Sequence, residues 1–93
     1  MCSYVVLVKS IEGHAKGAQG WFPATRLVVD YDHPTEALLE HSINIDFLNP
    51  QLGAGARAPL ELTIASAKTL AAAILSAVAI AEDVEREEAR IRA

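Results

Sequence analysis

The sequence predicts an α+β domain in which a four-stranded antiparallel meander sheet packs on one long C-terminal helix. Two observations support this fold class. Before Thr63 the chain contains four runs rich in β-branched or other large apolar residues, separated by segments rich in glycine, proline, asparagine or aspartate. From Thr63 onward it is rich in alanine, and the larger apolar residues recur at helical spacing. Strands followed by a single helix favour a two-layer architecture.

The first two predicted strands are residues 4–11 and 24–31. The first is rich in valine and apolar on both faces, so we expect it to be covered on both sides. The segment between them, EGHAKGAQGWFP at residues 12–23, contains three glycines and is predicted to be a loop.

The last two predicted strands are residues 42–48 and 58–63. SINIDFL at 42–48 alternates strictly, so its isoleucines and Phe47 should face the core. Pro59 indicates that the fourth strand lies at an edge of the sheet. The connection before the third strand should form at most a helical turn.

The predicted helix begins at Thr63, a suitable N-cap. Its apolar arc is wider than one sheet face needs, because Leu75 and Ile80 lie to either side of the main stripe, and this predicts a second contact with another subunit. Residues 82–93 should form a solvated helical extension, in which Glu82 and Arg86 have the spacing of an ion pair. The residues of the main stripe are Leu70, Ile74, Ala77, Val78, Ala81 and Val84.

Length and composition favour one domain, residues 1–93, that gains stability by forming a homodimer or larger oligomer. A net charge of -4 argues against nucleic acid as the partner. The continuous apolar run at 70–81 is shorter than the roughly 20 residues that cross a bilayer, so no membrane span is expected. The first residues lack the features of a secretory signal, and a single cysteine suits a reducing compartment. We therefore expect a cytoplasmic protein.

The glycine-rich segment is the candidate site for a small molecule. His14, Lys16 and Trp21 are the expected ligand-binding residues, with the indole covering an apolar ligand on a loop that glycines allow to adjust. Lys16 follows no Walker pattern, because neither Ser nor Thr comes after it. The alternative is a strand connection that Trp21 and Phe22 pin to the core.

A second candidate site combines Cys2, His33 and His41, which a meander brings to one end of the sheet. A cysteine and two histidines are a reasonable zinc set, with Asp32 or Glu40 as a fourth ligand or as an acceptor that orients an imidazole. No CxxC or HExxH spacing supports the site. The alternative is a buried Cys2, with the two histidines paired to the neighbouring carboxylates.

The sequence does not identify catalytic residues. Asp30, Asp46 and Glu61 are predicted to share the outward face of the sheet, which suggests acid–base chemistry. Their simpler interpretation is cross-strand pairing with Lys9 and Arg26.

The chain contains four distinctive motifs: GWFP at 20–23, DHP at 32–34, EH at 40–41 and INIDFLNP at 43–50. As a set, these motifs resemble a family of similarly short, uncharacterised actinobacterial proteins that begin with Met-Cys and end in an alanine-rich helix. The resemblance covers nearly the whole chain and implies a stand-alone domain, with no established activity to carry over. Three function classes stay open: a small-molecule binding domain, a zinc-type metal-binding domain or small metalloenzyme, and a structural or assembly accessory protein.

Overall fold

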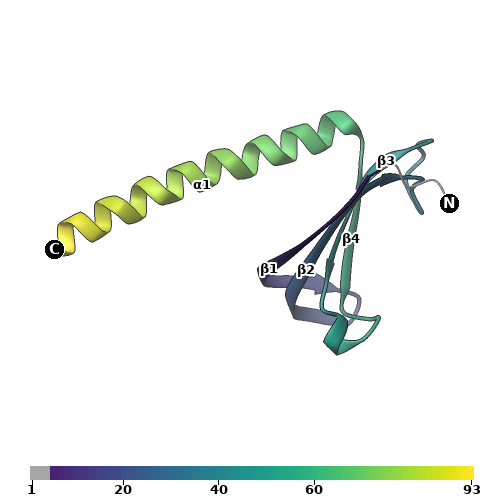
Figure 1. Ribbon diagram of the computed structural model, residues 1–93, viewed down its shortest axis with the longest axis horizontal. Helices are drawn as coiled ribbons and strands as arrows, with labels where there is room; N and C mark the ends of the chain where they lie inside the picture. Colours follow the sequence, from purple (N-terminus) through teal and green to yellow (C-terminus); the bar gives the residue numbers. More distant parts are fainter. Residues whose placement is uncertain (1–4) are drawn as a thin grey trace.

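The computed structural model describes residues 5–93 and confirms the α+β fold, a four-stranded antiparallel sheet followed by one long helix (Figure 1). Each strand pairs with its neighbour in sequence, which gives the order β1-β2-β3-β4 of a meander. A 3-10 turn, η1 (Pro50–Leu52), precedes the last strand. The remaining elements are β1 (Val5–Gly17), β2 (Gly20–Asp32), β3 (Ser42–Leu48), β4 (Arg57–Leu62) and α1 (Ile64–Arg92).

The prediction of a loop at residues 12–23 is wrong, because β1 and β2 continue as a long hairpin with Ala18 and Gln19 as its turn. Backbone pairing needs no side-chain pattern, so the glycines do not interrupt the ladder. Gly20 has φ 107, which suits a residue beside a tight turn. An irregularity between Ser10 and Gly13 absorbs one extra residue of β1, as a β-bulge does.

The small core lies at the turn end of the hairpin, where the sheet curls. Within residues 5–93, Phe22, Ala24 and Ala56 are the buried apolar residues. A Cβ on Gly17 would lie 2.6 Å from the carbonyl oxygen of Arg57, so only glycine lets the end of β1 approach β4 this closely. Four partly buried residues pack against this core: Ile11, Ala15, Phe47 and Ala58.

At the other end of the sheet, the strand register separates two faces. One is entirely apolar and has two cross-strand rows; we call these eight residues the apolar sheet face. On the opposite, polar face, Asp30 aligns with Asn44 and Glu61. The apolar rows are Val5, Tyr31, Ile43 and Leu62, then Leu7, Val29, Ile45 and Leu60.

Helix α1 begins as predicted but leaves the sheet. The Thr63 side chain caps it by accepting a 3.0 Å hydrogen bond from the amide of Ser66. Only Ala67 and Leu70 are half-buried, and every residue from Ala71 onward is exposed. The single extended residue between β4 and α1 directs the helix away from the strands, as Figure 1 shows. The stripe that was expected to lie on the sheet is therefore covered only at its first turns.

Residues 82–93 are helical and exposed, as the sequence predicts. Arg86 pairs with Asp83 rather than with Glu82, and Arg90 pairs with Glu87 three residues earlier. Both pairs place the acid N-terminal to the base, the orientation that a helix favours.

Candidate functional site

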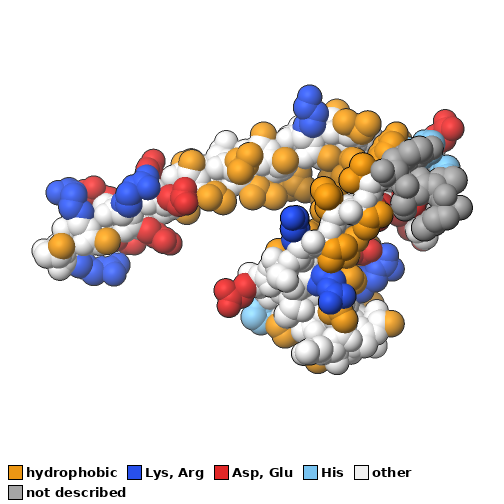
Figure 2. All heavy atoms as spheres, viewed as in Figure 1, with side chains coloured by type: hydrophobic (Ala, Val, Ile, Leu, Met, Phe, Trp, Pro, Cys, Tyr) orange, Lys and Arg blue, Asp and Glu red, His pale blue; other side chains and the backbone are white. Residues whose placement is uncertain are grey.

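The most prominent surface of this chain is apolar and lacks a covering layer. No residue of the apolar sheet face is buried, and Val5 and Leu7 are 50% and 52% exposed. Along α1, Ile74 is 53% exposed and Val78 45%. Figure 2 shows apolar side chains along the underside of α1 and on the sheet near its beginning, while charged side chains gather at the far end of the helix.

The dimensions of the chain show how incomplete this packing is. The radius of gyration is 16.2 Å, whereas a compact domain of this length has about 12 Å. The accessible surface is 7076 Å², which exceeds the roughly 5,200 Å² of a compact monomer of this mass. The excess of roughly 1,800 Å² is larger than the ~800 Å² that each partner buries in a standard protein–protein interface.

The apolar residues of α1 lie on one side of the helix. At 100° per residue, Ile64, Ala67, Leu70, Ile74 and Val78 fall within one arc; we call these five residues the helix stripe. The far side carries several polar residues, although Ile80 lies there too. These polar residues are Lys68, Thr69 and Ser76.

By length and composition, α1 is also able to cross a membrane, and none of its apolar stretch is buried in this structure. The predicted absence of a membrane span is based on the continuous apolar run at residues 70–81 alone. Starting at Ile64 instead lengthens the stretch to residues 64–81, with Lys68 as its one charge. This length falls inside the range of spanning helices, so the expected absence of a membrane partner stays a prediction.

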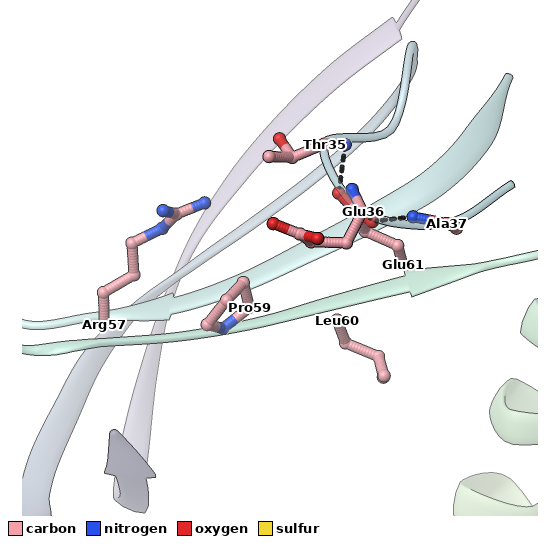
Figure 3. A pocket seen from close by; sticks show the side chains of 7 residues that line it. All are labelled: Thr35, Glu36, Ala37, Arg57, Pro59, Leu60 and Glu61. Atoms are coloured by element: carbon pink, nitrogen blue, oxygen red, sulfur yellow. Dashed lines mark hydrogen bonds between the residues drawn. The ribbon is translucent and has the colours of Figure 1, made fainter. Parts of the chain in front are cut away.

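The polar face of the sheet, in contrast, has a partial cover from the same chain near β4, although Val6 and Val8 on the β1 side of this face are 54% and 55% exposed. The Glu61 carboxylate accepts hydrogen bonds from the amides of Thr35, Glu36 and Ala37, at 2.5, 2.8 and 2.8 Å. These bonds hold the pKa of Glu61 below its ordinary value. Figure 3 shows Glu61 directed toward this segment and Leu60 directed away from it. The segment between β2 and β3 is thus tethered over the polar face.

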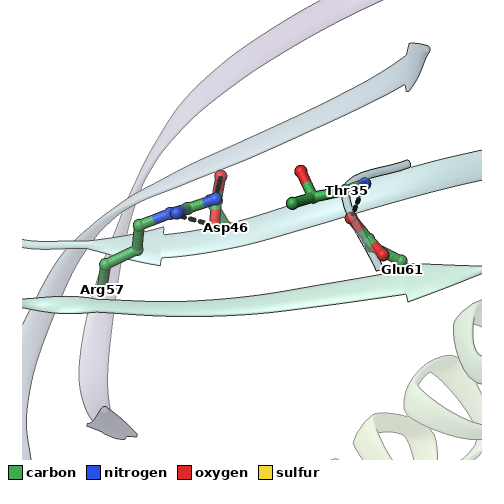
Figure 4. Close-up of polar contacts among 4 residues, drawn as sticks. All are labelled: Thr35, Asp46, Arg57 and Glu61. Carbon is green, nitrogen blue, oxygen red and sulfur yellow. Dashed lines mark hydrogen bonds and ion pairs between the residues drawn. The ribbon is translucent and has the colours of Figure 1, made fainter. Parts of the chain in front are cut away.

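Beside this tether, Arg57 and Asp46 form a bidentate ion pair with N–O distances of 2.9 and 3.2 Å (Figure 4). The hydrogen bond that Arg57 donates to the Asp46 carboxylate raises the pKa of Arg57. A cavity of about 510 Å³ lies between Arg57, Pro59, Glu61 and the tethered segment (Figure 3). Arg57 and Glu61 are already engaged with partners of this chain, so the ion pair and the tether serve the fold first.

The three expected ligand-binding residues share one face of the hairpin. Lys16 aligns directly with Trp21, and His14 aligns with Pro23. Trp21 is 70% exposed, so it is not the core anchor that the alternative interpretation requires; Phe22, with 7% exposure, is. Lys16 and Trp21 line different cavities, of about 420 and 140 Å³. Their role in ligand binding stays a prediction.

The expected zinc residues are partly brought together. The rings of His33 and His41 stack with centroids 4.6 Å apart, and the Tyr31 ring lies 5.5 Å from that of His41. Nδ1 of His33 lies 2.9 Å from the carbonyl oxygen of Glu40, so the backbone of Glu40 orients this ring. Cys2 falls outside the described residues. Within residues 5–93 no group of three or more His, Cys, Asp or Glu side chains is arranged to hold a metal.

Comparison with known proteins agrees with the motif resemblance. A family model described as "Family of unknown function (DUF6295)" matches residues 1–88. The chain belongs to this family. No curated protein and no solved structure matches it.

Sequence reasoning found the outward carboxylates but missed their partners. The shared outward face of Asp30, Asp46 and Glu61 is confirmed by the register. Instead of pairing with Lys9 or Arg26, Asp46 pairs with Arg57, and Asp30 accepts a hydrogen bond from Asn44. The Glu61 tether joins residues that lie 24 to 26 positions apart, and no local pattern signals such a contact.

Proposed function

We propose that this chain is a self-associating structural module, a small homo-oligomeric assembly domain whose apolar sheet face and helix stripe are buried between copies. One observation carries the proposal: the chain exposes a sheet face and a helix side that each have the composition of a core. Monomeric proteins rarely expose contiguous apolar patches beyond a few hundred Å². A cytoplasmic location, supported by the single cysteine, belongs to the same proposal.

The energetic argument favours association. Full burial of one valine, leucine or isoleucine side chain stabilises a protein by about 1.5–3 kcal/mol. The helix stripe and the apolar sheet face together offer several such side chains at half exposure or more, among them Leu7, Ile64 and Ile74. In contrast, the core of the single chain contains one large side chain, Phe22. Association would thus bury apolar side chains that the fold of one copy leaves exposed.

Light scattering on the purified chain tests this proposal. We expect a homodimer or larger assembly at tens of micromolar, and Val78→Asp should shift it toward monomer because a charge then replaces an apolar residue in the interface. Ser76→Asp adds the same charge on the opposite side of α1 and should leave the assembly intact. A monomeric parent chain would refute the proposal, and so would equal effects of the two variants.

Small-molecule binding is the second candidate function. The cavity beside Arg57 and Glu61, at about 510 Å³, has the size of a typical ligand site. A metabolite screen that follows Trp21 emission tests the expected site on the hairpin, and the same screen on Arg57→Gln tests this cavity. A ligand whose binding changes with neither Trp21→Ala nor Arg57→Gln would exclude both locations.

A further inference from the structure

The two faces of the sheet differ in what covers them. The chain folds its own segment over the polar face and tethers it through Glu61. Over the apolar sheet face, α1 makes its main contacts with β3 and β4, near the point where the helix begins. The β1–β2 side of this face therefore stays open, with Val5 and Leu7 at its margin.

The chain carries a segment that matches the open area in chemistry and in size. The outer strands of a four-stranded sheet lie about 14 Å apart, and a helix with side chains is about 10 Å wide, so a second helix fits beside the beginning of the first. Beyond Leu70 the helix continues through Ile74 and Val78, about three turns of exposed apolar surface that its own sheet does not reach.

The positions of charged residues also favour the helix of a second copy as the partner. Lys9 follows Leu7 by two residues, so it lies on the side of β1 that carries the apolar sheet face. On α1, Glu85 and Glu88 continue the line of the helix stripe toward the C-terminus. A helix that places Ile74 or Val78 over Leu7 thus brings acidic residues toward a lysine.

We propose that two copies pair reciprocally, each laying the helix stripe of α1 over the β1–β2 side of the other copy's apolar sheet face. The proposal rests on the self-association proposed above and specifies its geometry. Both elements belong to every chain, so the contact is self-complementary and closes under a two-fold axis. The excess surface of each chain exceeds what a standard interface needs. A bilayer is the less favoured occupant, because Lys68, Thr69 and Ser76 would then face lipid.

Disulfide trapping between two differently sized versions of the full chain tests this geometry. In a Cys2→Ser background, one version carries Leu7→Cys on the sheet, and a tagged version carries either Ile74→Cys or Val78→Cys on the helix. After mixing, subunit exchange and mild oxidation, we expect crosslinked heterodimers of sheet and helix cysteines. Ser76→Cys, on the opposite side of α1, should give severalfold less product. Val5→Cys replaces Leu7→Cys if the latter disturbs assembly in the reduced state.

The outcomes separate this geometry from self-association itself. If the parent chain is oligomeric but the Val78→Cys version crosslinks only to itself, and not to the Leu7→Cys version, the reciprocal pairing is overturned and a helix bundle is indicated. If the Leu7→Cys version crosslinks only to itself, the reciprocal pairing is overturned in favour of a contact between two sheets. A monomeric parent chain would refute the proposed function as well. If the parent chain floats with phosphatidylglycerol vesicles and its sheet–helix crosslinks disappear, the occupant is the membrane and the pairing is refuted.

Discussion

The two ends of the same sheet differ in how far their apolar residues are covered by the chain itself. At the hairpin turn, Gly17 and the buried alanines let the strands curl until Phe22 is enclosed by the chain itself. At the other end, bulky residues such as Val5 and Val6 occupy both faces of a more open sheet, and half of their surface stays in contact with solvent. Small side chains permit closure within one copy, whereas β-branched ones require a second layer.

The largest expected effect concerns the closed end. Phe22→Ala removes the only large apolar side chain that is buried within residues 5–93 and should destabilise the fold by about 3–5 kcal/mol, enough to unfold much of a domain this small. Trp21→Ala, one position away and 70% exposed, should cost little. Urea denaturation followed by circular dichroism measures both. Similar losses for the two variants would mean that the indole, too, supports the core.

The next largest loss of stability is expected from crowding at the hairpin turn, where Gly17 approaches β4. Gly17→Val places a Cβ against the carbonyl oxygen of Arg57, so the end of β1 must move and stability should fall by about 1–3 kcal/mol. Gly13→Ala is the matched control, since no atom lies within 4 Å of its added Cβ. Thermal melts compare the two. An unchanged melting temperature in Gly17→Val would show that β1 and β4 do not meet closely.

At the end of the sheet that contains Val5 and Leu7, which we call the open end, the stability should instead depend on protein concentration. If copies cover one another, each tenfold dilution lowers the stability of a dimer by about 1.4 kcal/mol, and the melting temperature falls accordingly. Val78→Asp should lose this dependence, while Ser76→Asp keeps it. Calorimetry at several concentrations provides the measurement, and a melting temperature that is independent of concentration in the parent chain would contradict a covered open end.

The tether on the polar face predicts an acid-sensitive contribution. The folded-state pKa of Glu61 is lowered by amides of the 35–37 segment, so its stabilisation is present above the unfolded pKa near 4.3 and is lost as pH falls through the folded value. Glu61→Gln should flatten the decline of stability below about pH 4. Glu82→Gln, on the exposed helix, is the control. Hydrogen exchange at Thr35 and Ala37 should quicken in Glu61→Gln, and an unchanged rate would argue against the tether.

Zinc has the smallest expected effect, because His33 and His41 supply two ligands and the third expected ligand, Cys2, lies outside the described residues. Zinc added to the reduced chain should raise its melting temperature slightly. This shift should disappear in His41→Ala and in Cys2→Ser, and persist in His14→Ala, which lies near the hairpin turn. Elemental analysis of untagged protein gives an independent measurement, and a shift that survives His41→Ala would place the metal elsewhere.

The sequence predicted the elements well where side-chain periodicity was strong. The alternation in SINIDFL located β3 at residues 42–48, and Thr63 marked the start of α1. It failed at residues 12–23, since strand pairing there depends on the backbone and on glycines that allow a close approach to β4. For the candidate sites, meander topology correctly brought His33 and His41 together. It did not anticipate the Glu61 tether.

By itself, therefore, the sequence determined which periodic segments are strand or helix and which sides of them are apolar, because those properties follow from local periodicity; residues 12–23, which lack such a pattern, were not determined in this way. Only the tertiary structure decided that the apolar sides of the sheet and of α1 meet within one copy at no more than the first turns of the helix. That outcome depends on the direction in which the chain leaves β4 at Thr63, and on whether side chains at each end of the sheet are small enough to let it close. Periodicity specifies which residues must be buried, whereas the geometry of the chain decides which surface covers them.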